Sequence, residues 1–176
     1  LGDKLYQAQV PSDLINYLKN NRLQPEIEKV WKANGSKTKG NWEQIFGKSD
    51  TSTSDWKNLA YLTEELFTVY HYAQYIGAVA AAGKAEYPIP MYVNAWIKQP
   101  KLNYPSKYPS GGPIPHTLDI WRAAAPSIDM IAPDIYIPEA IPVIESYRRP
   151  NNPIFIPEFR HDKVAAYEAL YAFGEQ

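Results

Sequence analysis

The run from Pro153 to Glu158 is a short apolar stretch that ends in a single carboxylate. Ile154, Phe155 and Ile156 are typical of a fully buried strand, and a proline on each side limits the length of that strand. Glu158 would then follow the C-terminal end of the strand. In barrels of alternating strands and helices, catalytic groups lie at this end of the strands. The run therefore predicts a buried strand that presents one candidate catalytic carboxylate.

Predicted helices and strands alternate through the second half of the chain. Two more apolar runs, 91–93 and 128–136, are typical of buried strands, and helical patterns over 116–125, 140–147 and 164–173 complete the alternation. Such alternation indicates a parallel α/β structure. Three strands followed by polar residues predict the C-terminal part of a (β/α)₈ TIM barrel. A complete barrel takes about 250 residues, so these 176 residues are expected to supply an incomplete one, cut at both ends.

The first half is predicted to be helical around one polar stretch. Helical patterns cover 13–20 and 25–33, and the strongest one runs from 59 to 80, where Glu65 is expected to face water. Residues from about 34 to 54 are interpreted as a polar loop insertion on the loop side of the barrel. A small apolar group is expected to anchor it: Trp42, Ile45 and Phe46. The insertion is either a plain connector or part of the rim of a site, since long loops often carry function.

Composition excludes several classes of function. The net charge is -1 without a basic block, so neither nucleic acid nor an anionic membrane is an expected partner. Cysteine is absent, which rules out a thiol nucleophile. The three histidines lack metal-ligand spacing, and no nucleotide-binding motif is present, so neither a metal nor a cofactor is expected. Aromatic residues reach 14%. They either stack on sugar rings or simply fill the core.

Polar and aromatic side chains follow each of the three predicted strands. The candidate site residues are Asn94, Trp96, Asp134, Tyr136, Glu158 and His161. A carboxylate beside aromatic faces is typical of glycoside hydrolysis, which needs two carboxyl groups. Asp134 could partner Glu158 or could instead bond backbone amides at the end of its strand. On spacing alone, a single Glu after a strand such as Glu158 more often forms a surface salt bridge.

Five segments, in order, carry a resemblance to a known family. They are 90–96, 108–116, 119–126, 132–136 and 152–158. Together they resemble the bacterial family 35 glycoside hydrolases, which are retaining β-galactosidases of the clan A barrel type. The resemblance covers the second half of the chain well and the first half loosely.

The resemblance implies a fold and a mechanism. It places barrel strands 5 to 7 at 91–93, 128–133 and 154–156, and it makes Glu158 the nucleophile of a double displacement. The family's acid/base is the Glu of an Asn-Glu pair at the end of strand 4. No such pair occurs here, so this group is expected upstream of the chain. No cofactor is implied, and the family suggests a periplasmic or secreted protein.

The resemblance also implies roles for the other strand-end residues. Tyr136 would bond the nucleophile or the sugar, Asn94 would take a sugar hydroxyl, and Trp96 would stack on the sugar. Asp134 and His161 complete the expected carbohydrate site. Two alternatives stay open: a degenerate or fragmentary barrel that binds carbohydrate without cleaving it, and a non-enzymatic half-barrel that self-associates through its open edges.

Overall fold

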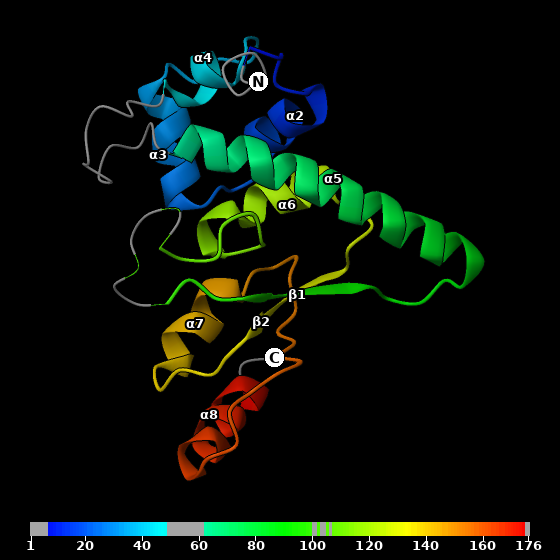
Figure 1. The fold of residues 1–176 in the computed structure, drawn as a ribbon, viewed down its shortest axis with the longest axis vertical. Helices are drawn as coiled ribbons and strands as arrows, with labels where there is room; N and C mark the ends of the chain where they lie inside the picture. Colours follow the sequence, from blue (N-terminus) through cyan, green and yellow to red (C-terminus); the bar gives the residue numbers. More distant parts are fainter. Residues whose placement is uncertain (1–6, 49–61, 100–101, 103–104, 106, 175–176) are drawn as a thin grey trace.

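The computed structural model describes residues 7–48, 62–99, 102, 105 and 107–174 (Figure 1). These residues form seven α-helices, one short 3₁₀ helix and a sheet of two strands. The elements are α2 Ser12–Asn20, α3 Pro25–Ala33, α4 Trp42–Phe46, α5 Leu62–Glu86, β1 Tyr92–Trp96, η2 Pro115–Thr117, α6 Leu118–Ala124, β2 Met130–Asp134, α7 Ala140–Tyr147 and α8 Lys163–Gly174.

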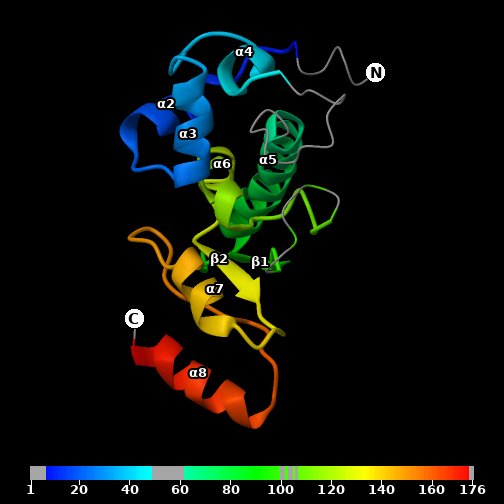
Figure 2. The ribbon, with the colours of Figure 1, turned by 90° about the vertical axis from the view of Figure 1, so that its left-hand side faces the viewer.

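The long helix α5 organises the first half of the chain. Leu66, Val69 and Ala73 are fully buried on one stripe of this helix, as their spacing of three and four residues requires. Helix α6 lies against α5, with α2 and α4 packed around the pair (Figures 1 and 2). The approach of α6 is close, because a Cβ added to Gly77 would lie 2.8 Å from the Cα of Ala125. A small residue is therefore needed at this contact.

The two strands are parallel and in simple register. Tyr92 pairs with Met130, and Trp96 pairs with Asp134. Helix α7 packs against β2 and α8 packs against α7, so α7 and α8 extend away from α5 (Figure 1). Because the strands are parallel, both of their C-terminal ends lie at the same end of the sheet.

The predicted third strand over 154–156 does not form. The backbone groups of alternate residues point towards the following segment. In β2 these residues are Ile131 and Pro133, and Ile135 follows directly after the strand. Pro133 has no backbone N–H to offer there. On the edge of β2 that faces away from β1, the backbone groups at the two ends find other partners. The side chain of Asn152 donates to the carbonyl of Ile131 and accepts from its N–H, at 3.0 and 2.8 Å.

The other end of this edge pairs with the chain beyond the predicted strand. The N–H of Ile135 donates to the carbonyl of Glu158, and the N–H of Arg160 donates to the carbonyl of Ile135, each at 3.0 Å. Ile131 is attached to Asn152 and Ile135 to Phe159. The chain advances four residues from Ile131 to Ile135 but seven residues from Asn152 to Phe159. The segment between them is too long to follow the ladder, so it passes the sheet without joining it.

The predicted fold class is therefore wrong. The described residues form a small mixed α/β domain with a two-stranded parallel sheet, and they do not form strands 5 to 7 of a TIM barrel. The alternation of elements is present, but alternation fixes only their order. Within the same residues, no helix combines the length and apolar character that crossing a membrane requires.

Part of the predicted insertion is a short anchored helix. Trp42, Ile45 and Phe46 of α4 are at most 1% exposed, which confirms the expected apolar anchor. Asn41 and Gln44 cap the start of α4 reciprocally, each side chain bonding the backbone N–H of the other at 2.9 Å. This arrangement satisfies two N–H groups that a helix start leaves free. The end of the insertion and the predicted helix start, 49–61, lie outside the described residues.

Candidate functional site

Asn94 and Asp134 are the first pair that the two strands bring together. Side chains alternate along each strand, so residues 94 and 96 of β1 share a face with residues 132 and 134 of β2. The side-chain amide of Asn94 donates to both carboxylate oxygens of Asp134, at 3.1 and 2.9 Å. Asp134 is buried while Asn94 is exposed. Among the described residues no hydrogen bond to the amide oxygen of Asn94 is found, so this exposed residue can offer that oxygen to a ligand.

Tyr136 and Glu158 form the second pair, next to Trp96. The Tyr136 hydroxyl donates to Oε2 of Glu158 at 2.9 Å. The Tyr136 ring stacks on the Trp96 ring with centroids 5.8 Å apart and planes 29° apart. Glu158 and Tyr136 are exposed and Trp96 is half-buried. The result is an accessible carboxylate beside a stacked aromatic pair.

The proton affinities at this edge follow from burial and from the Glu158 charge. The hydrogen bond to Glu158 raises the pKa of Tyr136, so its hydroxyl keeps the proton that it donates. Burial raises the pKa of Asp134, and the negative charge of Glu158 adds to this effect. The bonds from Asn94 oppose the rise by stabilising the charged form.

The raised pKa of Asp134 predicts a pH-dependent effect on stability. Its carboxyl group binds a proton more tightly in the folded chain, so its contribution is most favourable below about pH 4 and falls as pH rises through the folded-state pKa. Asp134→Asn removes the charge and keeps the shape. We expect this variant to have a higher free energy of unfolding than the parent at pH 7, with the difference vanishing near pH 3.

Urea unfolding of both proteins at the two pH values measures this difference, and Asp129→Asn is the matched control. A hydrogen bond from Lys84 lowers the pKa of Asp129, with a backbone bond from Met91 as the next cause. Its contribution is present at neutral pH and is lost as pH falls, so the control should be destabilised at pH 7. The same sign in both variants at pH 7 would refute the assigned environments.

His161 is the one predicted site residue that the structure leaves apart. It is exposed, and among the described residues no hydrogen bond joins it to the other five. Those five form two linked groups, Asn94 with Asp134 and Trp96 with Tyr136 and Glu158. No set of three or more His, Cys, Asp or Glu side chains in the described part of the chain could hold a metal ion.

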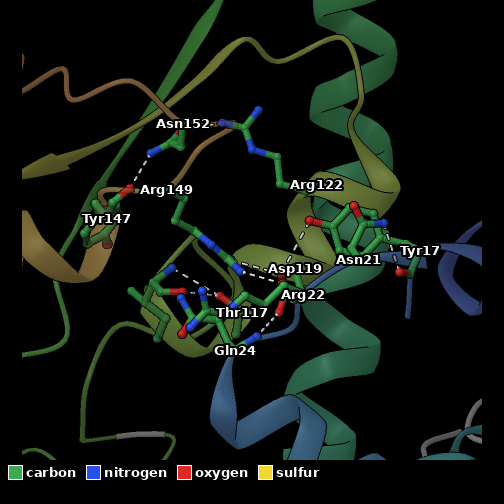
Figure 3. A network of polar contacts seen from close by, with 11 residues as sticks. Tyr17, Asn21, Arg22, Gln24, Thr117, Asp119, Arg122, Tyr147, Arg149 and Asn152 are labelled. Carbon is green, nitrogen blue, oxygen red and sulfur yellow. Dashed lines mark hydrogen bonds and ion pairs between the residues drawn. The ribbon is translucent and has the colours of Figure 1, made fainter. Parts of the chain in front are cut away.

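A cavity of about 820 Å³ lies elsewhere, between the α2–α3 turn and the turn after α7. Figure 3 shows the polar network beside it, centred on the buried carboxylate of Asp119. Arg149 donates to this carboxylate at 2.9 Å, and the N–H of Gln24 donates at 2.6 Å. Near the same cavity, Glu145 pairs with Arg148. Since these charges neutralise one another within the protein, the cavity does not rival the strand ends as a chemical site.

One cluster of three buried side chains was not predicted from the sequence. Glu65, Tyr108 and His116 are 5%, 3% and 4% exposed, and the expectation that Glu65 faces water is wrong. A signal for Glu65 was available, because it lies three residues after Leu62 and four before Val69, which places it on the apolar stripe of α5. Nothing in the pattern pointed to its partners, which come from a loop distant in sequence.

The comparisons with known proteins give no independent support for a family. No family model matches this sequence, and no curated protein matches it significantly. The resemblance to family 35 glycoside hydrolases rests only on the five segments described above.

Proposed function

We propose that the chain carries the nucleophile of a retaining glycoside hydrolase that acts on β-galactosides of oligo- or polysaccharides. The observation that carries this proposal is the exposed Glu158 carboxylate, held by the Tyr136 hydroxyl at 2.9 Å beside the Trp96 ring. A nucleophile must be accessible and oriented, and this carboxylate is both. The choice of galactosides and of retention comes from the family resemblance.

In the proposed reaction, an oxygen of Glu158 attacks the anomeric carbon while the bond to the leaving-group oxygen breaks. A general acid gives its proton to that oxygen, and water then releases the sugar and restores the carboxylate. Tyr136 orients Glu158, the amide oxygen of Asn94 accepts a sugar hydroxyl, and Trp96 supplies a stacking face.

The general acid is proposed to be a carboxyl group other than Asp134. Asp134 is buried and both of its oxygens are bonded by the amide of Asn94. It is therefore poorly placed to reach a leaving group. Its proposed role is to hold Asn94 in position.

A second candidate function is carbohydrate binding without turnover. It is favoured by the same site, because the stacked pair of Trp96 and Tyr136 offers an aromatic face while Asp134 is enclosed. Aromatic faces of this kind bind sugars without any chemistry. The two functions differ in one respect only, which is whether Glu158 forms a covalent bond.

Covalent trapping distinguishes them. A 2-deoxy-2-fluoro-β-galactoside with a dinitrophenolate leaving group needs no general acid, because dinitrophenolate departs unprotonated. We expect the mass of one fluorosugar on the peptide that contains Glu158, and no label on Glu158→Gln. Glu26→Gln, an exposed carboxylate on α3, is the matched control and should still be labelled. A label on a different residue would contradict the assignment, and sugar binding without any label would favour the second function.

A further inference from the structure

Glu65, Tyr108 and His116 form a buried polar cluster that the proposed chemistry does not use. Nε2 of His116 lies 2.8 Å from Oε2 of Glu65, and the Tyr108 hydroxyl donates to the same oxygen at 3.0 Å. The Tyr108 and His116 rings meet edge to face, with centroids 5.6 Å apart. Breaking hydrogen bonds between buried polar groups is costly, because a group left without a partner stays desolvated. The three side chains are therefore fixed relative to one another.

The cluster ties the loop between β1 and α6 to the long helix α5. Glu65 belongs to α5, while His116 lies in η2 and Tyr108 precedes it in the same loop. Thr117 closes the loop on itself, since its hydroxyl donates to the carbonyl of Gly112 at 3.0 Å. The segment from residue 108 to residue 117 is thus anchored at both ends.

This anchored loop contacts the chain on both sides of Trp96. A Cβ built on Gly112 would lie 3.5 Å from the Cβ of Ala95, so the loop backbone packs directly on the residue before Trp96. The ammonium group of Lys98, two residues after Trp96, lies 4.8 Å from the centre of the Tyr108 ring. A cation over an aromatic face at this distance is attracted to it. The loop therefore constrains the backbone that carries Trp96.

We infer that the Glu65–Tyr108–His116 cluster is a positioning device that sets the orientation of Trp96 at the candidate site. The cluster does not touch the substrate. It acts through the loop, Ala95 and Lys98, and Trp96 then stacks on Tyr136, which bonds Glu158. The consequence for sugar binding rests on the proposed function, whereas the consequence for Trp96 does not.

The test uses Tyr108→Phe, which removes one hydroxyl and keeps the ring under Lys98. The first readout is the indole N–H signal of Trp96 in a ¹H–¹⁵N correlation NMR spectrum of the sugar-free protein. This signal is assigned by its absence from the spectrum of Trp96→Phe. We expect the signal to shift or broaden in Tyr108→Phe. Tyr75→Phe is the matched control, because Tyr75 is exposed on the same helix as Glu65, and it should leave the signal unchanged.

The second readout is the dissociation constant for methyl β-galactoside. We expect binding to weaken about tenfold in Tyr108→Phe, comparable to losing one aromatic contact. A second variant, Glu65→Gln, tests the same cluster. If the Trp96 signal is unchanged in both Tyr108→Phe and Glu65→Gln, the inference is overturned. A shifted signal with unchanged affinity overturns the positioning role at the site. A parent protein that binds no galactoside refutes the proposed function alone, because the Trp96 signal still decides the inference.

Discussion

Glu158→Ala is expected to lower the rate of hydrolysis of dinitrophenyl β-galactoside by about 10⁴-fold or more. The reason is that the variant lacks the oxygen that forms the glycosyl-enzyme, and water alone replaces it poorly. Dinitrophenolate leaves without a proton, so the measured loss reports the nucleophile and not the general acid. Release of dinitrophenolate by purified parent and variant proteins measures the effect. Glu26→Ala should retain the parent rate.

Azide then identifies the role of Glu158 by stereochemistry. In Glu158→Ala, azide can occupy the space of the lost carboxylate and attack the anomeric carbon from that side. The product expected from a β-galactoside is α-galactosyl azide, formed with release of dinitrophenolate. If Glu158 were the acid/base, the covalent intermediate would still form on another residue, and azide would give the β product. Recovery of the β-azide, or full activity in the variant, would refute the nucleophile assignment.

Hydrophobic periodicity predicted most of the helices and two of the three strands. The predicted ranges of α3 and α7 agree with the structure, and β2 lies within the predicted run 128–136. β1 overlaps the predicted run 91–93 but continues to Trp96, so Asn94 and Trp96 lie within the strand and not after it. The failed prediction at 154–156 has a local cause. The predicted full burial fails too, since Phe155 is 38% exposed and Ile154 and Ile156 are half-buried. Pairing also needs donors on the neighbouring edge, and Pro133 removes one. Strand composition alone does not reveal which edge of a strand lacks an N–H.

At the candidate site, the sequence patterns indicated the residues, whereas the backbone pairing determines which of them are in contact. Asp134 was expected to partner Glu158 or to bond backbone amides, but its carboxylate instead accepts from the side-chain amide of Asn94 on the neighbouring strand. The contact of Tyr136 with Glu158 depends instead on the backbone bonds between Ile135 and residues 158 and 160. These bonds place Glu158 at the sheet edge although its own segment is not a strand. Glu158 was predicted to follow a buried strand, but its position results from the bonds that Ile135 makes with residues 158 and 160.

The largest effect on stability is expected from Asp119, the centre of the network in Figure 3. Its carboxylate is fully buried and joins three parts of the chain, because it accepts from Arg149 of the turn after α7 and from the N–H of Gln24 before α3. Asp119→Ala leaves the Arg149 guanidinium, only 14% exposed, without its partner. Removing one member of a buried ion pair costs about 3–5 kcal/mol. We expect a loss of this size in the free energy of unfolding, measured with urea at pH 7.

Two comparisons separate the buried charge from a general effect of truncation. Glu145→Ala breaks an exposed pair with Arg148, whose side chains are 39% and 43% exposed, together with an exposed hydrogen bond from Tyr171. It should cost about 1 kcal/mol or less. Asp119→Ala combined with Arg149→Met removes both buried charges and should cost less than the sum of the single changes, because neither charge is then left unpaired. Strict additivity would show that the pair does not couple. Since Asp119 belongs to α6 and Arg149 to the turn that leads to Asn152, which bonds Ile131 of β2, a coupled pair would be a strong link between the helical half of the chain and the segment beside β2.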